Sequence, residues 1–296
     1  MRAGAEKRKA DGKVERNGRH AEDGRERRTA FRSPLQMLDR LGEMVSRPFA
    51  DVCSLVSSAV GIFWMGLHPS RWNRAVRTVF VRQILFTAFE AVGAIVFCGL
   101  LIGLGVVLQA SLAFYKLGQE SHLGKVLVMV IVREVGPLMV NLFVIARSGT
   151  AIASEIATMV LMGDTRVLES QGMDLTHYLL LPRCFGVAVS VFCLTVIFVI
   201  TSMCTGGLAS FWIPALKGQS VRYFNDIYAA VMPTDIINLV AKSFIPGFLT
   251  ALICCRTGSS STVAVTMIPI ASAKGVVHSL TTLLVVTILI TLLTYL

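Results

Sequence analysis

Two adjacent charged residues, Arg133 and Glu134, interrupt a run of apolar residues that otherwise has the composition of a membrane-spanning helix. They lie about eight residues into that run, or roughly 12 Å along a helix that rises 1.5 Å per residue. A third charge, Lys242, interrupts another apolar run. Because a charge at bilayer depth costs about 2.5 to 3.5 kcal/mol on insertion scales, such side chains generally face a protein partner or a polar pathway. We therefore expect the three residues to face one polar pocket, either as a structural ion pair or as part of a pathway.

The motifs that would let this chain catalyse a reaction are absent from its sequence. There is no phosphate-binding GxxxxGK[ST] loop, no HExxH zinc motif and no GxSxG nucleophile turn. The five histidines have no metal-ligand spacing, and five of the seven cysteines lie in apolar runs, as small buried residues do. We therefore expect no catalytic residue, no metal site and no cofactor bound by this chain. Without a paired His, Asp or Ser–Lys arrangement, an intramembrane enzyme is also disfavoured.

The composition predicts an all-α polytopic membrane protein. Of the 296 residues, 54% are hydrophobic and only 16% are charged, whereas about a quarter of the residues in a soluble domain are charged. The apolar residues gather in runs of roughly 20 residues, the length at which a helix crosses a bilayer. Five transmembrane helices are predicted, at about residues 84–109, 126–146, 185–205, 236–255 and 276–296.

The positive charge of the chain is concentrated towards its N-terminus. Residues 1–32 contain eleven Lys or Arg against six Asp or Glu and few large apolar residues, which predicts a disordered basic tail. Residues 33–78 combine helical apolar spacing with intervening charges, which predicts an amphipathic lead-in lying in the membrane interface. Positive charge beside the first span marks the cytoplasmic side, so we expect the N-terminus in the cytoplasm and the C-terminus outside. Anionic headgroups, and not nucleic acid, are the expected partner of these charges.

An amphipathic segment follows the second predicted span. Within residues 155–172, apolar residues alternate with Asp164, Arg166 and Glu169. If the N-terminus lies in the cytoplasm, this segment also faces the cytoplasm, where a soluble ATPase could bind a short rigid helix. The alternative is a helix that only rests on the membrane surface.

Four motifs between residues 133 and 183 resemble those of a known family in both order and spacing. They are RExGP, RxGxAxxxEIxTM, LExxGxD and YLxxPR, and they resemble the MlaE/YrbE permease family over about residues 80–256. The positions that carry the resemblance are Arg133, Glu134, Gly136, Pro137, Arg147, Gly149, Ala151, Glu155, Ile156, Thr158, Met159, Leu168, Glu169, Gly172, Asp174, Tyr178, Leu179, Pro182 and Arg183.

The resemblance implies that residues 79–296 form an MlaE-type permease domain with a cytoplasmic coupling helix between its second and third spans. Members of this family pair as homodimers, bind a cytoplasmic ABC ATPase that uses ATP, and engage an MCE-domain protein on the outer face. They move phospholipids or other lipids between the bacterial inner membrane and the outer envelope. By this resemblance Arg133 and Glu134 border the lipid pathway, and the expected shared pocket adds Lys242.

The resemblance also implies a set of residues that couple the permease to its ATPase. They are Glu155, Met159, Asp164, Arg166, Glu169, Gly172 and Asp174. The alternative to a permease is a membrane scaffold that assembles an MCE-type complex without its own translocation path. A scaffold would not need charges within the bilayer, so the permease is the preferred interpretation.

Overall fold

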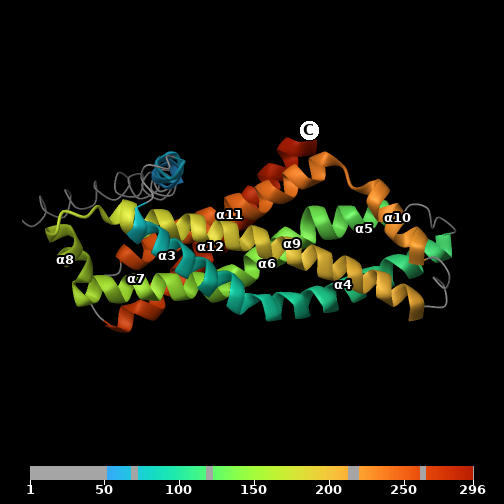
Figure 1. Cartoon of the computed structure of the whole chain (residues 1–296), viewed down its shortest axis with the longest axis horizontal. Helices are drawn as coiled ribbons and strands as arrows, with labels where there is room; N and C mark the ends of the chain where they lie inside the picture. The colour runs from blue at the N-terminus through green and yellow to red at the C-terminus, as the bar shows by residue number, and fades with distance from the viewer. Residues whose placement is uncertain (1–51, 68–72, 118–122, 213–219, 261–264, 296) are drawn as a thin grey trace, which may run out of the picture. The chain divides into compact units, whose positions relative to one another are not determined.

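The computed structural model of the chain describes residues 52–67, 73–117, 123–212, 220–260 and 265–295. Contacts divide the chain after Ser57, and the long helices all lie in the second unit, Ser58–Leu296. The elements of these described residues are helices, with no strand among them, which confirms the all-α prediction (Figure 1). The predicted basic tail at 1–32 and the first part of the predicted interfacial lead-in, 33–51, lie outside the described residues.

Within the part of the chain that the structure describes, five helical segments are long and apolar enough to cross a membrane, which agrees with the predicted number of spans. They cover Val76–Phe114, Leu123–Met162, Thr176–Ala209, Pro233–Ser260 and Val265–Thr294. Most are longer than the predicted spans, because the helices continue into polar residues that the apolar runs exclude. The second span, for example, continues as a helix through Arg147 and Glu155 to Met162.

Each span is built from one or more consecutive helical elements. The first consists of α3 (Arg74–Ile84), the π-helix η2 (Leu85–Phe89) and α4 (Glu90–Leu117). The second consists of α5 (Leu123–Leu127), the π-helix η4 (Val128–Val135), α6 (Gly136–Val144), the π-helix η5 (Ile145–Gly149) and α7 (Thr150–Met162). The other three spans are the π-helix η6 (Thr176–Leu180) with α9 (Leu181–Trp212), then α11 (Pro233–Ser260), then the 3-10 turn η8 (Val265–Met267) with α12 (Ile268–Tyr295). Two shorter helices, α8 (Asp164–Ser170) and α10 (Ser220–Ala230), lie between spans. The helices α9 and α11 form the centre of the bundle (Figure 1). Helix α9 packs against α3, α4 and α11, and α11 also packs against α7 and α12.

The first and third spans approach closely because α4 presents two glycines, Gly99 and Gly103, one turn apart. A Cβ atom placed on Gly103 would lie 2.6 Å from the backbone Cα of Ser202 in α9. At the same contact, the Ser202 hydroxyl donates a hydrogen bond of 3.0 Å to the Gly99 carbonyl. Small residues spaced by four let two membrane helices pack backbone against backbone, and here they also permit a hydrogen bond between the helices.

The second span loses its regular α-helical hydrogen bonding before Pro137, as a proline in a membrane helix predicts. Pro137 lacks an N–H group and stands in the first turn of α6. The eight residues before α6 form the π-helix η4. The Gly136 N–H donates to the carbonyl of Ile131, five residues earlier. This π-helix carries both Arg133 and Glu134, and π-helical turns frequently occur at functional sites.

Two glycines in left-handed conformations delimit the short helix α8. Gly163 has φ +83° and ends α7, and Gly172 has φ +76° and follows the end of α8. The Gly172 N–H donates to the Glu169 carbonyl at 2.9 Å, and the Met173 N–H donates to the Leu168 carbonyl at 3.1 Å. Such glycine turns are common at helix ends because only glycine adopts this conformation without strain. A single glycine therefore connects α8 directly to the second span.

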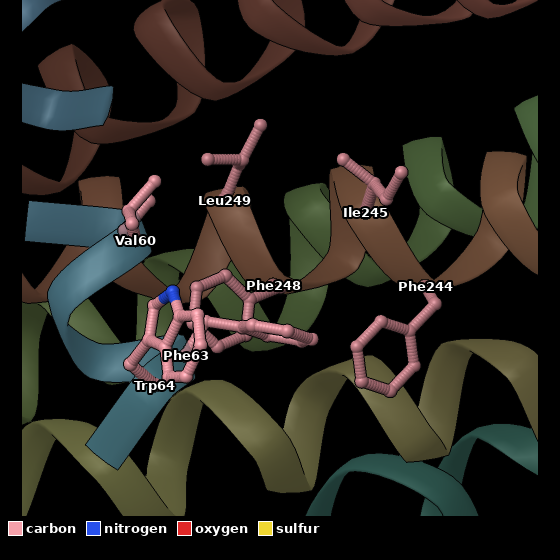
Figure 2. Close-up of a pocket in the computed structure, with 8 residues that line it drawn as sticks. Val60, Phe63, Trp64, Phe244, Ile245, Phe248 and Leu249 are labelled. Carbon is pink, nitrogen blue, oxygen red and sulfur yellow. The ribbon is translucent and has the colours of Figure 1, made fainter. Parts of the chain in front are cut away.

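A shorter apolar helix, described over Val52–Gly66, precedes the first span. Its residues Val60, Phe63 and Trp64 form one side of a groove of about 290 Å³ whose other side is α11. Figure 2 shows the aromatic character of this groove, with Phe63 and Trp64 beside Phe248 of α11. The Phe63 ring stacks on Phe185 of α9 with ring centres 6.0 Å apart and meets Phe248 edge-on at 6.3 Å.

Candidate functional site

The ammonium group of Lys242 is fully buried, with 0% of its side chain exposed, and it pairs with Glu134 of η4. The Lys242 Nζ donates to Glu134 Oε1 at 2.5 Å and to the backbone carbonyl of Arg133 at 2.9 Å. Thr291 of α12 donates from its hydroxyl to the same Glu134 oxygen at 3.3 Å. The second, fourth and fifth spans therefore meet at one ion pair, and the structure brings together Glu134 and Lys242 as the sequence predicts.

This ion pair lies far from the ends of its helices. Lys242 follows Pro233 by nine residues and Glu134 follows Leu123 by eleven, which places them about 14 Å and about 16 Å along their spans. The hydrocarbon core of a bilayer is about 30 Å thick. Both charges therefore lie well inside apolar helices, where an unpaired charge would be costly in a membrane.

Arg133, the third predicted residue, points to a different partner. Its Nε lies 2.7 Å from the Oδ1 atom of Asp235, whose side chain is only 1% exposed. The other carboxylate oxygen of Asp235 accepts the Met232 N–H at 3.0 Å, and this contact caps the N-terminus of α11. Asp235 thus fixes the start of the fourth span and neutralises Arg133 with the same carboxylate.

Two prolines explain why the second and fourth spans bind each other at this level. Because Pro137 has no N–H group, the Arg133 carbonyl four residues earlier lacks its usual helical donor, and Lys242 Nζ donates to it. In the same way Pro246 cannot donate to the Lys242 carbonyl, and the side-chain amide of Asn141 donates to that carbonyl at 3.2 Å. Each span therefore supplies a side-chain donor to a carbonyl that a proline has freed in the other.

A groove of about 350 Å³ opens beside the Glu134–Lys242 pair. Glu134 and Leu138 form one side, and the other side is one face of α12. That face consists of Leu284, Thr287, Ile288, Thr291 and Leu292. The Glu134 side chain is 43% exposed. A carboxylate set in an otherwise mostly aliphatic wall suits an amphiphile, with a polar end at Glu134 and an apolar body along the leucines and isoleucine.

The predicted coupling residues lie on α7, on α8 and in the turn that follows. Glu155 is exposed on α7 and accepts a 2.9 Å hydrogen bond from Arg183 of α9, and Met159 is half-buried one turn later. Asp164, Arg166 and Glu169 are exposed on α8. Gly172 and Asp174 follow; Gly172 makes the left-handed turn, and the Asp174 carboxylate accepts the Thr176 N–H at 2.9 Å. These last two residues have structural contacts that explain their identity without any partner.

A further charge in the second span, Arg147, pairs with Glu90 of α4. Its guanidinium also donates to the Phe86 carbonyl and lies 5.5 Å from the centre of the Phe86 ring. Each of the four charges Arg133, Glu134, Arg147 and Glu155 of the second span therefore has an oppositely charged partner on another span.

Asp235, Asn141 and Thr291 complete the site but are missing from the residues predicted from the sequence. The sequence did contain an indication that polar partners such as Asp235 and Asn141 are needed. Arg133 and Lys242 each precede a proline by four residues in a membrane span. Such a spacing frees a carbonyl and calls for a polar side chain on a neighbouring helix. Thr291 lies in an ordinary apolar run and gives no comparable signal. The described residues contain no group of three or more His, Cys, Asp or Glu placed to hold a metal ion.

Comparison with known proteins identifies the family. The family described as Permease MlaE matches residues 80–293. A probable ABC transporter permease protein of Rickettsia conorii is 28% identical over 214 residues, which covers 72% of this chain and 82% of the relative. The chloroplastic protein TRIGALACTOSYLDIACYLGLYCEROL 1 of Arabidopsis thaliana is 27% identical over 209 residues, covering 70% of this chain and 57% of the relative.

A third relative carries a name that refers to its cargo. The intermembrane phospholipid transport system permease protein MlaE of Haemophilus influenzae is 26% identical over 157 residues, covering 50% of this chain and 59% of the relative. The family match spans the second, third and fourth transmembrane segments completely and nearly all of the first and fifth, including every residue of the Glu134 groove. The chain is a multi-pass membrane protein that belongs to the MlaE permease family.

Proposed function

We propose that this chain is the permease subunit of an ATP-driven transporter that moves lipid, in the first place phospholipid, between the inner membrane and the outer envelope. The observation that carries the proposal is the Glu134 groove. It combines a carboxylate with a mostly aliphatic wall inside the apolar helices, which matches the two-part chemistry of a lipid. The name of the Haemophilus influenzae relative, a phospholipid transport permease, supports the same cargo.

ATP hydrolysis belongs to a separate subunit in this proposal. The names of the Rickettsia relatives, probable ABC transporter permeases, support a partner that carries the ATPase site. Two copies of this chain pair as a homodimer, a cytoplasmic ABC ATPase binds the inner face and an MCE-domain protein binds the outer face. The chain lies in the inner membrane with its N-terminus in the cytoplasm and its C-terminus in the periplasm.

The segment proposed to contact the ATPase is α8 together with the end of α7. The charged residues of α8 are exposed, and the helix is joined to the second span by Gly163 alone. The second span also carries Glu134, so a displacement of α8 would be transmitted along one continuous helical segment to the groove. This continuity supports α8 as the coupling helix over a helix that only rests on the membrane.

Photo-crosslinking to lipid tests the proposed pathway at neighbouring positions of one helix. Ile288 lines the groove, whereas Leu289 is exposed on α12 but does not line it. A photoreactive residue at 288 should capture phospholipid in intact membranes at several times the yield found at 289. Equal yields at the two positions would mean that the groove holds no more lipid than the general surface, and the scaffold alternative would then be preferred.

A further inference from the structure

The polar side of the Glu134 groove is built to accept hydrogen bonds. Glu134 is the ionised residue among the described residues that line the groove, and nearly half of its side chain is exposed there. One of its two oxygens, Oε1, already binds Lys242 and Thr291. A carboxylate has about four acceptor positions and no donor, so Glu134 retains capacity to accept from a ligand.

The cations near this carboxylate and the Thr291 hydroxyl are committed to the protein. The Lys242 side chain is 0% exposed, and its ammonium binds Glu134 and the Arg133 carbonyl from behind the wall. The one hydroxyl proton of Thr291 lies between the Thr287 carbonyl at 2.9 Å and Glu134 at 3.3 Å. Arg133 is paired with the buried carboxylate of Asp235. The negative end of the Glu134–Lys242 pair therefore faces the groove, and its positive end faces the protein interior.

We infer that the groove selects lipids whose headgroup carries a primary ammonium, such as phosphatidylethanolamine, over lipids that end in a phosphate monoester, such as phosphatidic acid. This inference rests on the proposed lipid-transport function and adds the chemical class of the cargo. An ammonium supplies both the positive charge and the N–H donors that Glu134 lacks, and a charge-assisted hydrogen bond of this kind is among the stronger polar contacts. A terminal phosphate would bring two negative charges towards a carboxylate without a free cation to bind it.

Native mass spectrometry of the purified full-length chain can measure this selection directly. The delipidated protein in detergent is given an equimolar mixture of phosphatidylethanolamine, phosphatidylcholine and phosphatidic acid with identical acyl chains. Phosphatidylethanolamine should be retained about tenfold over phosphatidic acid, the ratio expected when one lipid makes a charged hydrogen bond that the other lacks. Phosphatidylcholine, whose quaternary ammonium has no N–H, should be retained less than phosphatidylethanolamine.

Three variants assign the preference to the groove. Because Glu134→Gln alone leaves the buried Lys242 ammonium without its carboxylate, the double change Glu134→Gln with Lys242→Met removes both charges together and keeps the protein testable. The double variant should retain the three lipids equally. Leu289→Ala, outside the groove, should keep the tenfold preference, and Leu284→Trp, which fills the groove, should reduce the retention of every lipid.

The outcomes separate this inference from the proposed function. Equal retention of all three lipids by the unmodified chain, lost in Leu284→Trp, would overturn headgroup selection and leave the groove as a lipid site. An unchanged preference in the double variant would place headgroup recognition elsewhere and would likewise overturn the inference. Equal retention of phosphatidylcholine and phosphatidylethanolamine would contradict recognition through N–H donors. If Leu284→Trp changed the retention of no lipid, the proposed function at this groove would itself fail.

Discussion

At the scale of single residues, the site is a set of charged and polar side chains within the spans whose partners come from other spans. Lys242 binds Glu134, Asp235 binds Arg133, and Asn141 binds a carbonyl freed by Pro246. Breaking a buried ion pair by removing one partner typically costs about 3 to 5 kcal/mol, whereas replacing both partners by neutral residues of similar volume can be nearly neutral. The Glu134–Lys242 pair should therefore be asymmetric in its response to single and double changes.

The first prediction applies this asymmetry. Glu134→Leu should lower the thermal stability of the purified protein strongly, because it leaves the Lys242 ammonium unpaired inside the protein, at a cost of about 3 to 5 kcal/mol. Adding Lys242→Met to the same chain should recover most of the lost stability. Thermal unfolding followed by fluorescence-detected size-exclusion chromatography measures both effects. A double variant no more stable than Glu134→Leu would show that the pair does not control stability in this way.

Part of the site could be predicted from the sequence, because placing a charge in an apolar membrane helix costs free energy. Arg133, Glu134 and Lys242 stand out because a charge in an apolar run requires an explanation, and the structure confirms that Glu134 and Lys242 meet. The separate pairing of Arg133 with Asp235 was not predicted, because it depends on where the fourth span begins. Asp235 lies one residue before the predicted span and becomes part of it only because Pro233 starts the helix there. Thr291 could not be found, since a threonine in a membrane helix usually bonds its own backbone.

At the scale of elements, packing depends on where backbones touch. Gly103 faces Ser202 at backbone contact distance, whereas Gly105 on the same helix has no atom within 4 Å of the position its Cβ would take. Helix packing therefore requires a glycine at position 103 of the first span but not at position 105. The two positions provide a matched pair for testing the interface between α4 and α9.

The second prediction uses this pair. Gly103→Ala should destabilise the protein by about 1 to 3 kcal/mol, because the added methyl group would overlap the Ser202 backbone and force α4 and α9 apart. Gly105→Ala should be neutral or stabilising by about 0.5 to 1 kcal/mol, since alanine favours a helix over glycine. Thermal stability of the two variants in the same detergent gives the comparison. Equal effects at both positions would contradict the close contact.

The third prediction concerns α8. Asp164→Arg together with Glu169→Arg should leave membrane abundance unchanged, because both residues are exposed and surface changes usually alter stability by less than about 0.5 kcal/mol. The same double change should abolish co-purification of the ATPase, because like charges brought together at an interface cost several kcal/mol. Quantitative affinity purification with a tag on this chain provides the measurement. Normal recovery of the ATPase would show that it contacts another part of the chain, and residues 256–275 would be the next segment to test.

The sequence predicted the number of spans but not the extent of the helices. Apolar runs identify the residues that favour hydrocarbon, whereas a helix continues for as long as its backbone groups can be paired. The second span therefore continues past Arg147 and Glu155, because each of these charges has a partner on another helical element. It ends at Met162, where Gly163 adopts a left-handed conformation. The four π-helices among the described residues were not predictable from composition, apart from the disturbance expected before Pro137.

At the scale of the whole molecule, an odd number of spans gives the two ends of the chain opposite locations. Among the described residues five helices are long and apolar enough to cross a membrane, and the basic N-terminal flank predicts that the N-terminus lies in the cytoplasm. The proposed orientation would place α8 in the cytoplasm, where an ATPase could reach it, and α10 on the outer face, where an MCE-domain protein could.

The fourth prediction is the orientation itself. A reporter that is active only in the periplasm should be active when it is fused after residue 296, and a reporter active only in the cytoplasm should be active when it is fused at the N-terminus. Activity of the cytoplasmic reporter at residue 296 would reverse the assignment of α8 and α10 and remove the proposed ATPase contact.

The most direct test of lipid transport is ATP-dependent transfer of a fluorescent phospholipid by the transporter reconstituted in proteoliposomes. The complex is purified through a tag on this chain, together with its ATPase. We expect ATP to stimulate lipid transfer several-fold, and we expect this stimulation to be lost in Leu284→Trp, which fills the Glu134 groove, but kept in Leu289→Ala. ATP hydrolysis with no lipid transfer, or full transfer by Leu284→Trp, would contradict a lipid pathway through this groove.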